Sequence, residues 1–465
     1  MIENKYDSSS KSSILEYAKI LEGKSLKDSC GDIAISSRAN KGNFGTLLEE
    51  FYFGYKPNSN SEADFYEAEL ELKSTPLRRL KNGEWVCKER LVLNIINYLD
   101  IPYEDFMNSS FWKKNKNLLL VFYLWERELL PLDYVIDLVG IWDFPQKDLK
   151  IIQRDWNLIK SKITSGQAHL LSEGDTIYLG ACTKGSTSEK SFRKQPFSDE
   201  LAKQRAFSLK RSYLNTIYNS LNGAIEYDSI LSESELDEGS FDDLIVRKIE
   251  PYFSLSVKDI QSRLGLELNQ RSKNYFSSIS NRIIKRILGV SEEKFIEEFE
   301  KASITIKSIR VEENGRIKEN ISLPAFKFED LIEEDWNDSI LKDTIENKFL
   351  FVFYKKNAEQ HTLERAGFWN LSSKDMDEFE RVFNVTKEII KSGEIIRDIS
   401  EKGIVRNNFP KLKDSYLTHI RPHATNRVDT YSLPVPDKKT KQKEFTKQSF
   451  WINSSYVEMI YRALS

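Results

Sequence analysis

The chain has 465 residues, of which 40% are hydrophobic and 12% aromatic, and this is enough apolar material for two or three packed domains. The net charge of −3 argues against binding of nucleic acid by bulk electrostatics alone, and no apolar run approaches the ~18 residues that would span a membrane. Three scattered cysteines lack metal-binding spacing, and the first residues lack the apolar core of a signal peptide, so we expect a cytoplasmic protein.

The first half of the chain predicts a mixed sheet with flanking helices. An amphipathic helix over residues 42–52 precedes a short strand over residues 68–74, in which charged and apolar side chains alternate. Pro76 is expected to end that strand because it has no N–H to donate. An Asn-Gly turn at 82–83, a long apolar strand over residues 117–125 and a helix over residues 147–163 complete an α/β (α+β mixed sheet) layer domain.

The second half repeats landmarks of the first half in the same order. The strand that holds Glu71 and Lys73 is echoed around Thr305 and Lys307, and an Asn-Gly turn follows each. Further on, the run Val-Phe-Tyr at 121–123 recurs at 352–354. An acidic, Ser-rich stretch lies between the halves. The sequence therefore predicts two copies of one fold, residues 1–222 and 246–465, joined by an acidic linker at 223–245.

Three charged residues in the first copy, Asp64, Glu71 and Lys73, have the spacing D-x6-E-x-K. On a strand, Glu71 and Lys73 share the polar face, and Asp64 lies a short turn upstream. Two carboxylates can hold a divalent metal ion for phosphodiester hydrolysis, with the backbone carbonyl of Leu72 as a further ligand. The neighbouring ammonium can stabilise the developing charge. The alternative is an edge strand whose charges are only solvated.

A further acid and a basic stretch bear on the same chemistry. Glu49 follows two leucines in the first predicted helix, where burial would be costly without a partner or a metal ion. The alternative is that Glu49 faces water. Residues 184–211 are rich in lysine and arginine, which suits phosphate contacts or, alternatively, a solvated helix face. The sequence has no phosphate-binding loop of the Walker type, so no nucleotide cofactor is expected.

These motifs together resemble a known family. The pattern Lys41-Gly-x-x-Gly-x-Leu-Leu-Glu49, followed by Asp64 and by Glu71-Leu-Lys73-Ser-Thr-Pro76, resembles the mismatch-repair endonuclease MutH. It resembles more closely the GATC-cutting type II restriction endonucleases of the Sau-three-A kind, and the resemblance runs over nearly the whole chain. The resemblance implies two tandem PD-(D/E)xK domains, Mg²⁺ as the cofactor and double-stranded DNA containing 5′-GATC as the substrate.

The resemblance also implies roles for individual residues. Asp64 and Glu71 would hold the metal ion, Lys73 would be the catalytic lysine and Glu49 a supporting acid. The DNA contacts that it implies are Lys41 and Lys116 near the cleaved phosphate, a base-reading loop of Thr183, Lys184 and Gly185, and phosphate contacts from Lys210 and Arg211.

The second copy lacks part of this machinery. Thr305 stands in place of Glu71, Lys307 matches Lys73 and Glu298 falls near Asp64, while Ile284 or Lys285 stands where Glu49 would be. With a threonine in place of a central ligand, we expect neither metal binding nor cutting by this copy.

A loop of the second copy predicts a different task for it. Arg421-Pro-His-Ala-Thr-Asn426 resembles the base-reading loop of MutH, so Arg421, His423 and Asn426 are expected to bind a second DNA site. The second domain would then be an allosteric effector without catalysis. The alternative is a scaffold that only supports the first domain.

The sequence thus predicts a GATC-specific type II restriction endonuclease of a restriction-modification system. It would be a monomer in solution, and because it has one active site, cutting both strands requires dimerisation on DNA or two sequential events. Two other functions stay open: a MutH-like nicking endonuclease of mismatch repair, and a non-enzymatic, sequence-specific DNA-binding protein. The duplication argues against the first of these, because MutH resembles a single copy.

Overall fold

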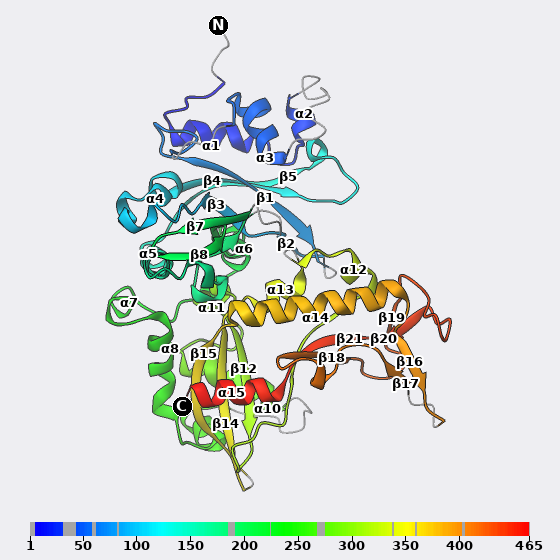
Figure 1. Ribbon diagram of the computed structural model, residues 1–465. Coiled ribbons are helices and arrows are strands. Elements are labelled where there is room, and N and C mark those ends of the chain that lie inside the picture. Colours follow the sequence, from blue (N-terminus) through cyan, green and yellow to red (C-terminus); the bar gives the residue numbers. More distant parts are fainter. Residues whose placement is uncertain are drawn as a thin grey trace. The chain divides into compact units, whose positions relative to one another are not determined.

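The computed structural model describes residues 5–30, 43–57, 62–80, 83–184, 191–223, 225–266, 275–336, 339–358, 360–401 and 405–464. The chain divides into two compact units, residues 1–237 with 294–303 and residues 238–293 with 304–465. Each unit is a mixed α/β structure, as expected (Figure 1). Within the described ranges, no helix combines the length and the apolar composition that crossing a membrane requires.

The central sheet of the first unit has the strand order β2-β1-β4-β5, with β1 and β4 parallel and the other neighbours antiparallel. Its strands are β1 (Glu71–Arg79), β2 (Trp85–Cys87), β4 (Asn117–Leu124) and β5 (Ile136–Asp143). Residues 118–122 are fully buried, because one face of β4 packs on the N-terminal helices and the other on α6 (Arg211–Asn222). The apolar strand expected over residues 117–125 is therefore confirmed.

The other elements of the first unit flank this sheet. A second sheet has the order β3-β9-β6, and β7 and β8 form a hairpin. The helix expected over residues 147–163 is confirmed as α5. The elements are α1 (Lys11–Lys19), α2 (Leu26–Cys30), α3 (Phe44–Leu47), β3 (Leu91–Ile95), α4 (Ser110–Asn115), α5 (Gln146–Thr164), β6 (Leu179–Thr183), β7 (Phe192–Gln195), β8 (Ser198–Lys203), β9 (Arg205–Leu209), β10 (Tyr227–Asp228), α7 (Glu235–Glu238), β11 (Phe295–Ile296) and α11 (Glu297–Ala302).

The strand that holds Glu71 and Lys73 differs from its expected bounds. It begins only at Glu71, because Glu69 has a φ of 52° that interrupts the alternation. It also continues past Pro76 to Arg79, so the expectation that the proline ends it is wrong. The carbonyl of Leu77 accepts from Trp125, directly after β4, whereas that of Pro76 accepts from Lys88 on the opposite edge, and β2 pairs with β1 only from Leu77 onward. The missing N–H therefore costs no bond to β4.

The helix expected over residues 42–52 has an unusual form in its described part. Asn43 caps α3 by accepting from the amide of Gly45, and α3 passes at once into a π-helix, η3 (Leu48–Phe53). Gly54 ends the π-helix with a φ of 80°. π-Helical turns are rare and are frequently found at functional sites, and this one holds Glu49.

The second unit repeats this architecture. Its sheet has the order β12-β14-β15, again with the first pair parallel and the second antiparallel, and a second sheet has the order β13-β21-β18. The elements are α8 (Phe241–Ile249), α9 (Val257–Leu264), α10 (Tyr275–Ile287), β12 (Thr305–Val311), β13 (Ile321–Phe326), α12 (Phe328–Glu333), α13 (Ile340–Ile345), β14 (Phe349–Asn357), β15 (Gln360–Trp369), α14 (Ser373–Ser392), β16 (Ile396–Ile399), β17 (Val405–Asn407), β18 (Thr418–Pro422), β19 (Thr430–Ser432), β20 (Glu444–Thr446), β21 (Gln448–Ile452) and α15 (Ser454–Ala463).

The two units also share strand register. Glu71 lies opposite Leu118 in the β1–β4 ladder, and Thr305 lies opposite Phe349 in the β12–β14 ladder. An irregularity in pairing follows at the matching position of β4 and of β14, after the phenylalanine of each Val-Phe-Tyr run. This agreement in register supports the alignment of Thr305 in the second unit with Glu71 in the first.

A short segment directly before β12, residues 294–303, belongs to the first unit. The ammonium of buried Lys301 lies 2.7 Å from Asp148 of α5, and β11 pairs with β10. The carboxylate of Glu298 accepts the backbone N–H groups of Ile230 and Leu231. Part of the stretch expected as a linker is therefore folded, as β10, α7 and the start of α8.

Candidate active site

The first of the expected site residues lie together at the start of β1. Glu71 is 1% exposed, and its Oε1 accepts a hydrogen bond of 2.6 Å from the ammonium of Lys73. Both residues are held by the parallel ladder to the buried strand β4. The strand thus fixes an acid and a base next to each other at the edge of the unit's core.

Asp64 joins this pair through two reciprocal hydrogen bonds. Its backbone N–H donates to Glu71 Oε2 at 3.1 Å, and its Oδ2 accepts from the backbone N–H of Leu72 at 3.0 Å. The six residues between the two acids therefore form a turn that returns Asp64 to the strand. The structure brings Asp64, Glu71 and Lys73 together.

Glu49 faces the same group of charges from the π-helix. Burial raises the pKa of Glu49 to about 7, and the negative charge of Asp64 adds to that effect. The helix approaches β1 closely, since a Cβ on Gly45 would lie 3.2 Å from Ser74 Oγ. Glu49 is therefore an acid within the electrostatic range of Asp64 and Glu71, with its ionised form disfavoured.

Two lysines of the α4–β4 segment lie at different distances from the acids. Lys116, the expected contact, forms an ion pair of 2.6 Å with exposed Glu69. Lys114 was not singled out from the sequence, yet its ammonium lies 3.6 Å from Glu71 Oε1 and its side chain is 12% exposed. Burial raises the pKa of the Glu71 carboxyl, and the charges of Lys73 and Lys114 oppose that rise. The only sequence signal for Lys114 was its position before the buried strand.

The oxygen groups at this place suit a hard divalent cation. Asp64 and Glu71 are held about one site, and the carbonyl of Leu72 belongs to the strand residue between Glu71 and Lys73. No three acidic, histidine or cysteine side chains of the described chain form a metal cluster by themselves. Mg²⁺ needs only one or two protein carboxylates, since it retains waters and takes substrate phosphate oxygens. The donor set therefore fits such an ion.

The expected DNA contacts of the first unit are spread over several elements. Thr183 ends β6, and the backbone N–H of Lys184 donates to the carbonyl of Gln204 at 2.8 Å. Lys210 is 9% exposed and its ammonium donates to the carbonyl of Thr176, so this side chain points into the protein. Arg211 begins α6. Lys41 and Gly185 lie outside the described residues.

The matching place in the second unit has a different composition. Thr305 is exposed at the start of β12, and burial lowers the pKa of Lys307. Lys285 donates to the carbonyl of Glu292, while Ile284 is fully buried. Glu298, expected near the position of Asp64, belongs to the first unit. None of these groups pairs with Thr305 as Asp64 pairs with Glu71 in the first unit.

The expected effector residues lie on and after β18. The guanidinium of Arg421 stacks over the ring of Trp451 at 4.7 Å, and His423 Nδ1 lies 3.1 Å from Ser449 Oγ. The side chain of Asn426 accepts from the backbone N–H groups of Val428 and Asp429. Arg421 and His423 are thus held by β21, whereas Asn426 shapes its own turn.

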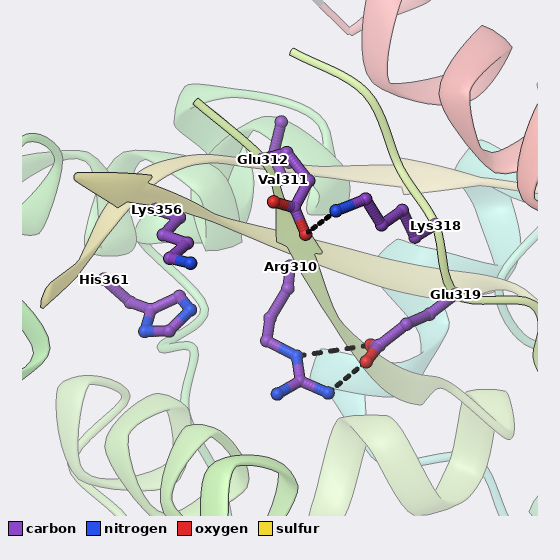
Figure 2. Close-up of a pocket in the computed structure, with 7 residues that line it drawn as sticks. All are labelled: Arg310, Val311, Glu312, Lys318, Glu319, Lys356 and His361. Carbon is purple, nitrogen blue, oxygen red and sulfur yellow. Dashed lines mark hydrogen bonds and ion pairs between the residues drawn. The ribbon is translucent and has the colours of Figure 1, made fainter. Parts of the chain in front are cut away.

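A cavity of about 280 Å³ lies elsewhere in the second unit (Figure 2). Its lining residues are Arg310, Val311, Glu312, Lys318, Glu319, Lys356 and His361. Arg310 pairs with Glu319, and Lys318 pairs with Glu312 at 3.2 Å. Because each carboxylate of this cavity is held by a cation, it offers no metal site like that of the first unit.

Glu71 and Lys73 at the start of β1, with Asp64 bonded to the same strand, form a set of side chains that suits metal-dependent hydrolysis. Comparison with known proteins gives the class directly. Residues 53–155 match the family model of the DNA mismatch repair enzyme MutH. The chain is 34% identical to the type II restriction enzyme Sau3AI of Staphylococcus aureus, over 96% of this chain and 97% of that protein. The chain belongs to this family of MutH-like restriction endonucleases, enzymes that hydrolyse DNA and generally use divalent metal ions.

The raised pKa of Glu49 predicts a pH-dependent stability of the metal-free protein. The folded pKa of Glu49, about 7, lies above the pKa of a glutamate in the unfolded chain. The free energy of unfolding therefore falls as the pH rises from the unfolded pKa to the folded one. Glu49→Gln is neutral at every pH, so in EDTA its melting temperature should exceed that of the parent increasingly from pH 5 to pH 8. Glu50→Gln, at the exposed neighbour, should show a flat difference. A flat difference for Glu49→Gln would contradict a raised pKa of this half-buried acid.

Proposed function

We propose that the protein cleaves both strands of DNA at 5′-GATC by Mg²⁺-dependent phosphodiester hydrolysis. The observation that supports this most is the reciprocal pair of hydrogen bonds between Asp64 and the Glu71–Leu72 strand, with Lys73 beside Glu71. The GATC specificity follows from the sequence resemblance to the Sau3AI kind of enzyme, which extends through the expected base-reading loop. The protein would act in the cytoplasm as part of a restriction-modification system.

In this proposal Asp64, Glu71 and the carbonyl of Leu72 hold the ion. When bound, Mg²⁺ supplies Lewis-acid polarisation of the phosphate and lowers the pKa of a water ligand. Lys73, fixed by Glu71, orients the attacking water and stabilises the negative charge that develops on the phosphate. Glu49 is the supporting acid: with a pKa of about 7 it can accept a proton near neutral pH.

The DNA contacts are assigned by position and charge. We propose that Lys114, as the partly buried ammonium beside Glu71, contacts the phosphate that is cleaved, and that Lys41 and Lys116 contact phosphates around it. Thr183, Lys184 and Gly185 would read base edges in the major groove, where lysine can bond to guanine. Arg211 and, after release of its carbonyl partner, Lys210 would hold the backbone.

For the second unit we propose DNA binding without catalysis, through Arg421, His423 and Asn426. The support is the replacement of Glu71 by Thr305 at the same register, which removes a carboxylate that the metal would need. A second GATC duplex bound here would promote cutting by the first unit. The chain would be a monomer in solution, and the two strand cuts would come from dimerisation on DNA or from two successive events.

Replacement of the corresponding lysine of each unit by alanine tests which unit cuts DNA. Lys73→Ala should lower the cleavage rate at saturating Mg²⁺ by about a hundredfold or more, because it removes the charge that stabilises the reacting phosphate. Lys307→Ala, the matched change in the second unit, should cut at the parent rate. Gel analysis of plasmid cleavage, with an EDTA control that should abolish all cutting, gives both rates. Equal loss in the two variants would contradict a single active site.

Addition of a short GATC duplex in trans tests the effector role. The parent should cut a one-site plasmid faster when the duplex is present, whereas Arg421→Ala should keep the basal rate and lose the acceleration. A duplex without GATC is the control for bulk electrostatic effects. If the GATC duplex leaves the parent rate unchanged, the second unit has no effector role.

A further inference from the structure

Tyr55 follows directly after the turn that closes the π-helix. Its backbone N–H donates to the carbonyl of Glu49 at 3.1 Å, across Gly54. Its ring packs edge-on against Phe65, the neighbour of Asp64, with the ring centroids 5.6 Å apart. The backbone and ring of Tyr55 are therefore tied to the two segments that hold Glu49 and Asp64.

The hydroxyl of Tyr55 is buried and makes no hydrogen bond with any described residue. Burial of a polar group without a partner is costly, so it calls for an explanation. Three other tyrosines of the same aromatic cluster do have acceptors. Tyr6 donates to the carbonyl of Phe53 at 3.0 Å, and Tyr17 and Tyr52 donate to each other's carbonyls at 3.1 and 2.7 Å. Among these four tyrosines, Tyr55 alone lacks an acceptor.

Three carboxylates act on the hydroxyl of Tyr55. Burial raises the pKa of Tyr55, and the negative charges of Asp64, Glu49 and Glu71 raise it further, with Asp64 first among them. The group therefore remains an O–H donor, and Asp64 is the carboxylate that acts on it most strongly. One oxygen of Asp64 accepts from the N–H of Leu72, while its other oxygen has no hydrogen-bond partner among the described residues.

The geometry points to Tyr55 as a positioning residue, whose hydroxyl donates to the carboxylate of Asp64 when a divalent ion is bound and so fixes the orientation of that ligand. This role rests on the proposed function, because it requires Asp64 to be a metal ligand. Carboxylates that ligate metals are themselves hydrogen-bonded, and loss of such a bond weakens metal affinity by roughly 10–100-fold. The Asp64 carboxylate would then be the acceptor for the buried hydroxyl of Tyr55.

The test compares Tyr55→Phe with Tyr6→Phe in the full chain. Mn²⁺ binding without DNA is measured from the electron paramagnetic resonance signal of the free ion, and thermal unfolding is measured in EDTA. Tyr55→Phe should bind Mn²⁺ roughly 10–100-fold more weakly and should unfold at the parent temperature or above it, since it removes an unpaired buried hydroxyl. Tyr6→Phe should bind Mn²⁺ like the parent and unfold at a lower temperature, because it loses a made hydrogen bond.

The outcomes separate this inference from the proposed function. If the parent binds Mn²⁺ and Tyr55→Phe binds it equally well, the role of Tyr55 is overturned and the proposed active site stands. If the parent binds no Mn²⁺, or if Asp64→Asn binds it as well as the parent does, the metal site itself is overturned and the role of Tyr55 with it. If Tyr55→Phe binds Mn²⁺ more weakly than the parent and also melts at a lower temperature than Tyr6→Phe, Tyr55 has a packing role. That outcome would also overturn the inference.

Discussion

The site depends on the two hydrogen bonds that return Asp64 to β1. The N–H of Asp64 donates to Glu71, and the N–H of Leu72 donates to Asp64, so each acid is oriented by the backbone next to the other. Like charges placed so close repel each other, and burial adds a further cost. The ammonium groups of Lys73 and Lys114 offset part of that cost, and a divalent cation between the acids would remove most of it.

The second unit keeps the same fold although it lacks the acid that corresponds to Glu71. Its parallel strand pair and its register match those of the first unit, although Thr305 stands where Glu71 does. The buried strands β4 and β14, whose side chains fill the core, therefore preserve the fold without the acids. Glu298 and Lys301, just before β12, are used instead inside the first unit, where Lys301 neutralises buried Asp148.

Sequence reasoning predicted the features that depend on local pattern. The apolar run of β4, the periodicity of α5 and the D-x6-E-x-K spacing all follow from side chains close together in the chain. Lys114 could not be chosen over Lys116, because both precede the same strand and only the fold decides which ammonium lies near Glu71. The continuation of β1 past Pro76 was also missed, since it depends on pairing with β4, which is distant in sequence. The apolar pattern of the first helix did not distinguish the π-helix η3 from an ordinary α-helix.

The central claim is that Asp64, Glu71 and Lys73 of the first unit cut both strands of DNA at one recognised sequence. Sequencing of both strands at the ends produced from a supercoiled plasmid with Mg²⁺ tests it most directly. The account predicts that every new 5′ end, on each strand, falls at GATC, and that Lys73→Ala forms these ends about a hundredfold or more slowly than the parent. Ends on one strand only, ends at unrelated sequences, or ends formed by Lys73→Ala at the parent rate would contradict it.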